Sequence, residues 1–241
     1  MLLFVDSTVR EDSRTRRLAE RLVSRLADDD VRVLHLEDEH LRPFDARTLD
    51  RRTRAIEAGR RNSPLLAKAA EFASADQIVM AAPFWDLSFP ALLKTYIEWI
   101  SVIGVVFRYS NDGRPIGLCR ARRLFYVSTS GGPAETDPFG FGYVEALAKS
   151  FWGIPDVHRI AATGLDIVGA DVEAILRSAE TRLAEDVADG ADAGVSVRRL
   201  SRDERIDHPP GDGTGRRQGR QGIRGEPSRL DDFGAVRPEF P

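Results

Sequence analysis

Short, mostly apolar runs recur along the chain, separated by segments in which apolar residues repeat at helical spacing. The runs lie at residues 2–5, 31–36, 77–82, 124–127 and 157–162. Runs of this length are typical of strands that are buried within a parallel sheet. The pattern therefore predicts five strands, and the wholly apolar first run indicates that the first strand is central.

The segments between these strands predict helices. They are expected over residues 18–26, 46–60, 90–100, 143–151 and 172–183, with another helix starting at Ser63 and Pro64. The helical character of residues 46–60 is weak because this segment is highly charged. Strands that alternate with helices define the doubly wound α/β plan, with a five-stranded parallel sheet. Residues 107–109 and 115–118 flank a turn rich in Asn, Asp and Gly, which predicts a β-hairpin excursion from this plan.

The last part of the chain has a different composition. Residues 193–241 are rich in Gly, Pro, Arg and Asp and show no sustained apolar period, so a disordered C-terminal tail is expected after a domain at residues 1–192. Arginines at residues 216–224 are able to contact an anionic partner, but a basic cluster in a tail that also carries acidic residues is usually solvated chain.

Charge and cysteine usage narrow the class of protein. The chain has 35 basic and 38 acidic residues, a formal charge of −3, so a nucleic-acid partner is disfavoured. No run of 18 apolar residues occurs, and the apolar start lacks the length and basic flank of a secretory signal. Cys119 is the only cysteine, which fits a structural thiol in a reducing compartment. We therefore expect a cytoplasmic protein without a membrane segment.

Three loops follow predicted strands at the carboxyl edge of the sheet, where ligands bind in doubly wound folds. The first carries the hydroxyl groups of Ser7, Ser13 and Thr15 and the guanidinium groups of Arg10 and Arg14. Hydroxyl donors beside a helix start favour a phosphate monoester site. The alternative is that Asp12 or Ser13 only caps the helix.

The other two loops favour a flat ligand. The second contains Pro83, Phe84, Trp85, Asp86 and Leu87, whose aromatic rings either contact a planar group or belong to the core. The third contains Thr129, Ser130, Gly131 and Gly132, where the glycines either admit a ligand close to the backbone or form a simple turn. One ligand that needs all three loops is flat and phosphorylated, and FMN has this structure.

Metal and nucleophile chemistry are disfavoured. His35, His40, His158 and His208 lack the paired spacing of metal ligands. The sequence contains neither a GxSxG motif nor a cysteine paired with histidine. We therefore predict no metal site and no catalytic side chain, and expect a cofactor to supply the reactivity.

At these loops the sequence resembles the flavodoxin-like, FMN-dependent NAD(P)H oxidoreductases, especially NADH azoreductases and quinone reductases. Residues 7–15 are similar to the family's first phosphate loop, residues 83–98 to its flavin loop and following helix, and residues 128–132 to its second flavin loop. The hairpin, at residues 104–117, and residues 151–154 also match. The chain departs from the family at Asp86, where Asn is common, and at Ser130, where Arg is common.

The resemblance implies a flavodoxin-like fold and a two-step reaction. NADH or NADPH reduces FMN, and the reduced flavin passes two electrons to a small-molecule acceptor such as a quinone or an azo compound. It further implies a homodimer, with Trp99, Phe107 and Tyr109 as candidate contacts to the partner. A flavin-binding electron carrier or redox sensor has the same loops and is the alternative. A nucleic-acid function of the tail is a third possibility, and the charge balance disfavours it.

Overall fold

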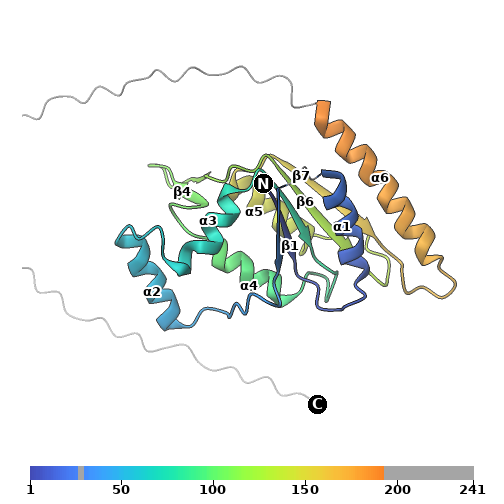
Figure 1. The fold of residues 1–241 in the computed structure, drawn as a ribbon, viewed down its shortest axis with the longest axis horizontal. Helices are drawn as coiled ribbons and strands as arrows, with labels where there is room; N and C mark the ends of the chain where they lie inside the picture. The colour runs from blue at the N-terminus through green and yellow to red at the C-terminus, as the bar shows by residue number, and fades with distance from the viewer. Residues whose placement is uncertain (27–29, 193–241) are drawn as a thin grey trace, which may run out of the picture. The chain divides into compact units, whose positions relative to one another are not determined.

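The computed structural model describes residues 1–26 and 30–192, which form a doubly wound α/β fold (Figure 1). Five parallel strands have the order β2-β1-β3-β6-β7, so the predicted fold class is confirmed, and the first strand lies inside the sheet with a partner on each side. These strands are β1 (Leu2–Asp6), β2 (Val31–His35), β3 (Gln77–Ala81), β6 (Arg123–Thr129) and β7 (Asp156–Ala162). The tail expected at residues 193–241, and with it the predicted domain end, lies outside the described residues.

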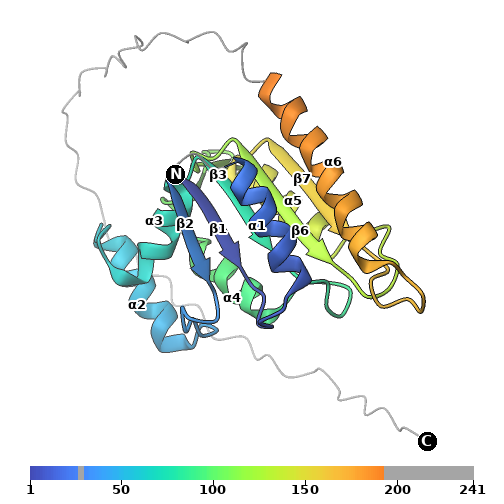
Figure 2. The ribbon, with the colours of Figure 1, turned by 45° about the vertical axis from the view of Figure 1, so that its right-hand side comes forward.

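Both faces of the sheet are covered by helices because side chains alternate along each strand. Leu2 and Phe4 of β1 pack on one face, and Leu3 and Val5 on the other. Figure 2 shows α1 and α6 over the first face. The second face is covered by α3, α4 and α5. The helices are α1 (Arg14–Leu26), α2 (Ala46–Glu57), α3 (Ala67–Ser74), α4 (Ala91–Ile100), α5 (Phe141–Leu147) and α6 (Val172–Asp192).

Three helical regions differ in detail from the sequence pattern. The helix expected from Ser63 and Pro64 begins as a short 3-10 helix, Pro64–Leu66, before α3. The weak region at residues 46–60 is α2, which begins after Asp45 because this carboxylate accepts a hydrogen bond from the Thr48 N–H at 2.6 Å. The helix expected over residues 143–151 is α5 followed by a π-helical turn, Ala148–Trp152. The turn ends at Gly153, whose φ of 75° suits glycine. The Trp152 side chain is thereby fully buried against Phe72.

The predicted hairpin is confirmed as β4 (Phe107–Tyr109) and β5 (Pro115–Gly117), which pair antiparallel. It packs against the π-helical turn, with the ring centroids of Phe107 and Phe151 5.1 Å apart. Gly117 lies directly on Gly153, since a Cβ at Gly117 would be 2.1 Å from the Gly153 nitrogen. The hairpin is therefore held against the rest of the domain by a direct contact between the backbones of Gly117 and Gly153.

Cys119 follows this hairpin, and its thiol donates weakly to the Val106 carbonyl at 3.7 Å. Burial raises the pKa of the thiol to about 12, against an ordinary 9.0. We expect iodoacetamide to alkylate the native protein at pH 8 on the order of 1000-fold more slowly than the urea-unfolded chain, because only the thiolate reacts. Mass spectrometry of timed samples measures both rates. Equal rates would show that the thiol is accessible and has an ordinary pKa.

Candidate functional site

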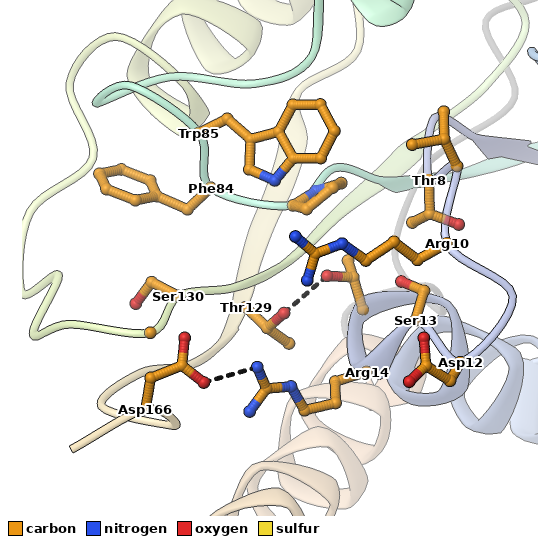
Figure 3. Close-up of a pocket in the computed structure, with 14 residues that line it drawn as sticks. Thr8, Arg10, Asp12, Ser13, Arg14, Phe84, Trp85, Thr129, Ser130 and Asp166 are labelled. Atoms are coloured by element: carbon orange, nitrogen blue, oxygen red, sulfur yellow. Dashed lines mark hydrogen bonds and ion pairs between the residues drawn. The ribbon is translucent and has the colours of Figure 1, made fainter. Parts of the chain in front are cut away.

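A cavity of about 420 Å³ opens at the carboxyl edge of the sheet (Figure 3). It lies where β1, β3, β6 and β7 end, as expected for a doubly wound fold. Its lining comes from the three predicted loops and from the loop after β7: Thr8, Val9, Arg10, Asp12, Ser13, Arg14, Thr15, Pro83, Phe84, Trp85, Thr129, Ser130, Gly131 and Asp166. The structure therefore brings together most of the site residues that the sequence pointed to.

The first loop ends at the start of α1. The Ser13 hydroxyl accepts a hydrogen bond from the Arg16 N–H at 3.2 Å, so Ser13 caps the helix and also lines the cavity. The N–H groups of residues 14 and 15 precede any intrahelical acceptor, as in the first turn of every helix. The hydroxyl oxygens of Thr15 and Thr129 lie 2.6 Å apart and join the first loop to the third. This end of the cavity combines a helix dipole with hydroxyl donors, which suits an anion.

Ser7 lies outside the cavity. Its side chain is fully buried, and its hydroxyl donates to the Ala81 carbonyl at 2.7 Å. Because Ser7 directly follows β1, this hydrogen bond links the end of β1 to the end of β3. The next residue, Thr8, lines the cavity in its place.

The two arginines of the first loop differ in their partners. Arg14 donates to the Asp166 carboxylate at 2.7 Å and to the Leu165 carbonyl at 3.2 Å. Arg10 has no ion pair with any residue in the described ranges, and Figure 3 shows its guanidinium group reaching across the cavity. The Arg10 guanidinium is therefore available to a ligand, whereas the Arg14 guanidinium holds the loop after β7 in position.

The second loop forms a tight turn at the rim. Trp85 and Ser88 exchange backbone hydrogen bonds of 3.0 and 2.8 Å across Asp86 and Leu87. Both central residues have positive φ, 52° and 64°, as a type I′ turn requires. Leucine in this conformation is strained, and such strain is concentrated at functional sites. Pro83, Phe84 and Trp85 line the cavity, whereas Asp86 and Leu87 do not.

Asp86 borders a second groove of about 590 Å³, beyond Trp85. Its lining includes four aromatic residues, Trp85, Phe89, Phe139 and Tyr143. The Trp85 side chain, 40% exposed, borders both hollows. The cavity and the groove therefore adjoin each other at Trp85. Most residues that line the cavity are polar, whereas most residues that line the groove are apolar.

The third loop presents backbone to the cavity. Gly131 lines it, and a Cβ there would lie 2.2 Å from an oxygen of Asp166, so only glycine fits without a shift. The Ser130 hydroxyl donates to the Gly132 carbonyl at 2.7 Å and is thereby engaged within the loop. Gly132 is exposed and does not line the cavity.

A buried ion pair lies beneath the first loop and was not found from the sequence. The Asp6 carboxylate is 0% exposed and accepts hydrogen bonds from Arg16 Nε at 2.6 Å and from the Thr8 N–H at 2.9 Å. His35 Nδ1 lies 3.0 Å from the same carboxylate. Arg16 also donates to the Thr8 carbonyl at 3.2 Å, so the pair holds the backbone of the first loop in place.

Sequence reasoning also did not select Thr8, Val9 or Asp166 as site residues. The available signal for Asp166 was its place after the fifth strand, which ends at the same edge as the others. Within the described ranges, no group of three or more His, Cys, Asp or Glu residues is arranged to hold a metal ion. Nor is any helix there long and apolar enough to cross a bilayer.

The fold and the cavity together define a doubly wound α/β protein whose sheet edge is suited to a phosphorylated, ring-containing ligand. The chain belongs to the family described as having a flavodoxin-like fold, which matches residues 1–187. The resemblance stated from the sequence is therefore confirmed.

Individual relatives agree with this assignment. The FMN-dependent NADH:quinone oxidoreductase of Clostridium perfringens is 31% identical over 180 residues, which are 71% of this chain and 90% of that one. The FMN-dependent NADH:quinone oxidoreductase 2 of Clostridium acetobutylicum is 44% identical over 119 residues, 47% of this chain but only 58% of that one, which is less than two thirds of its length. A Bacillus anthracis FMN-dependent NADH-azoreductase, solved in complex with FMN, shares the fold with a TM-score of 0.66 at 20% identity, covering 79% and 98% of the two chains.

Proposed function

We propose that this chain is an FMN-dependent NAD(P)H oxidoreductase that passes two electrons to a small acceptor such as a quinone or an azo compound. The observation that carries the proposal is the cavity, which joins an anion-suited helix start to aromatic rings and close backbone at one sheet edge. The names of the relatives at 31% and 44% identity support the same activity.

The residues that line the cavity fit FMN. We assign the phosphate to Ser13, Thr15, Arg10 and the first N–H groups of α1, because these donors surround one end of the cavity. We assign one side of the ring to Pro83, Phe84 and Trp85, and its polar edge to Ser130 and Gly131. Arg14, Thr129 and the turn at Asp86 and Leu87 then hold these walls in position.

When bound, FMN supplies the hydride and electron-transfer chemistry, and no side chain is assigned as an acid or base. The chain binds and orients the reactants. The strained turn after Trp85 fixes the ring wall, and a rigid wall keeps donor and acceptor at the distance that transfer requires. The neighbouring aromatic groove supports a planar, aromatic acceptor.

The proposal includes a cytoplasmic homodimer. Of the three candidate contacts, Trp99 stacks on Phe44 with ring centroids 4.8 Å apart, and its indole donates to the Arg42 carbonyl. Phe107, in strand β4 of the hairpin, is buried, whereas Tyr109 of the same strand is 49% exposed and is available to a partner. The single thiol supports a reducing compartment.

The test is the visible spectrum of the purified protein, with and without added FMN, followed by anaerobic NADH or NADPH. We expect a bound flavin band that the nicotinamide bleaches, and then steady NAD(P)H oxidation when a quinone or azo dye is added. Free FMN at the same concentration is the control for reaction without protein. Absence of FMN binding would contradict the proposal, and bleaching without turnover would identify an electron carrier or sensor instead.

A further inference from the structure

The loop after β7 places a carboxylate, Asp166, in the wall of the cavity. Its side chain is 65% exposed, so a ligand in the cavity is able to reach it. The loop is fixed to the third loop by three backbone hydrogen bonds, which run from the N–H groups of Gly164, Leu165 and Asp166 to the carbonyls of Gly132, Ser130 and Gly131 at 3.0, 3.1 and 3.0 Å. The backbone of Asp166 is thus held in place by hydrogen bonds.

Both carboxylate oxygens have a defined place. Oδ1 accepts from Arg14, the first residue of α1, at 2.7 Å. Oδ2 lies against the Cα of Gly131, where a Cβ would come within 2.2 Å of it. The carboxylate therefore lies between the helix start, which suits a phosphate, and the glycine of the third loop, which suits a ring edge. Figure 3 shows it on the side of the cavity opposite Phe84 and Trp85.

The chemistry of a carboxylate limits what it can contact. An ionised carboxylate only accepts hydrogen bonds, so it serves ligand groups that donate. A phosphate dianion has no proton to donate and is repelled by a second negative charge. In FMN, the part that joins the phosphate to the ring is the ribityl chain, and its three hydroxyl groups are donors.

We propose that Asp166 is a specificity-determining residue that accepts hydrogen bonds from the ribityl hydroxyl groups, while Arg14 holds its carboxylate in the required orientation. This inference rests on the proposed function. It assigns different tasks to three charged residues of the wall: Arg10 contacts the phosphate, whereas the pair of Arg14 and Asp166 contacts a neutral polyol. The site is then selective for flavins that carry a sugar-like chain.

The test measures the dissociation constants of three flavins by quenching of flavin fluorescence. FMN has the ribityl chain and the phosphate, riboflavin has only the ribityl chain, and lumiflavin has neither. For Asp166→Ala we expect FMN and riboflavin to bind about tenfold more weakly by similar factors, because charge-assisted hydrogen bonds are lost, and lumiflavin to bind as in the wild type.

Two further variants separate the direct contact from other effects. Glu135→Ala removes an exposed carboxylate elsewhere and is expected to leave all three affinities unchanged, which controls for net charge. Arg14→Met keeps the Asp166 carboxylate but removes the guanidinium that orients it. We expect this variant to weaken the binding of FMN and riboflavin more than the binding of lumiflavin. Equal weakening of all three flavins by Asp166→Ala would overturn the proposal, because it would show that Asp166 only supports the loop.

Tighter binding of FMN alone by Asp166→Ala would also overturn the proposal, since it would show that the carboxylate merely repels the phosphate. The wild-type protein is measured first. If it binds none of the three flavins, the proposed function fails and the inference fails with it. If it binds FMN but the variants give either contrary pattern, only the inference fails.

Discussion

Replacing Arg16 with methionine is expected to lower the free energy of unfolding by about 3 kcal/mol. The reason is that the Asp6 carboxylate is fully buried, and its charge is balanced mainly by the Arg16 guanidinium at 2.6 Å, which is itself 23% exposed. Removal of one partner leaves an uncompensated buried charge, which costs about 3–5 kcal/mol in fully buried pairs, so we take the lower end. Urea unfolding followed by circular dichroism measures the change.

The neighbouring arginine provides a matched control. Arg17 pairs with Glu173 at 2.9 Å on the surface, and this hydrogen bond raises the pKa of Arg17. Since exposed pairs contribute little, Arg17→Met is expected to shift the melting temperature by no more than about 2 °C. The double variant Asp6→Asn with Arg16→Met is expected to lose less stability than Arg16→Met alone. Equal losses for Arg16→Met and Arg17→Met would contradict the buried-charge argument.

The same Arg16 substitution is expected to weaken FMN binding. Arg16 and Asp6 together hold Thr8 by its carbonyl and its N–H, and Thr8 lines the cavity. Arg17 has no such contact, so Arg17→Met is expected to leave FMN affinity unchanged.

Gly117→Ala is expected to destabilise the domain by about 3 kcal/mol, by a different mechanism. The added methyl group would meet the backbone of Trp152 and Gly153 at 2.1 to 2.3 Å. Backbone atoms cannot rotate away as a flexible side chain does, so the hairpin must separate from the π-helical turn. We expect a lower urea midpoint and a red-shifted tryptophan fluorescence, because Trp152 is uncovered.

Gly142→Ala is the control for this substitution. Gly142 lies in α5, and its added Cβ would meet the Asp137 carbonyl oxygen at an ordinary 3.5 Å. Alanine is favoured over glycine in helices by about 1 kcal/mol, so the stability is expected to rise slightly. If Gly117→Ala were as well tolerated as Gly142→Ala, the hairpin would not be fastened by the contact seen between the two backbones.

The strands were predictable because strands buried on both faces have few polar interruptions. All five residues of β1 are buried, and its sequence reads as one apolar run up to Asp6. The apolar pattern of helix α2 was weak because Ala55 is the one residue of this helix that is buried. The π-helical turn was not predictable, since it depends on the packing of Trp152 and on the backbone contact of Gly117 with Gly153 rather than on local spacing.

The site was predictable in its position but only partly in its residues. The carboxyl ends of parallel strands meet at one edge whatever the sequence, so the loops at residues 7–15, 83–87 and 129–132 were identified. Which residue of each loop faces the cavity depends on the direction that the backbone takes after the strand. In the first loop this direction turns the Ser7 side chain into the sheet and places Thr8 in the lining of the cavity. The pairing of Arg14 with Asp166 joins residues 152 positions apart, and no local pattern reports such a contact.

That wide separation also bears on when the site forms during protein synthesis. The cavity needs residues 8–15 from the start of the domain and Asp166 from near its end, and the central strand β1 pairs with β3, whose residues emerge much later. A ribosome-bound chain that ends before residue 166 therefore lacks one wall. A ligand that binds only the completed cavity stabilises the finished domain and not its nascent forms. The proposed cofactor would then stabilise the domain after its release and would not act on the earlier steps of folding.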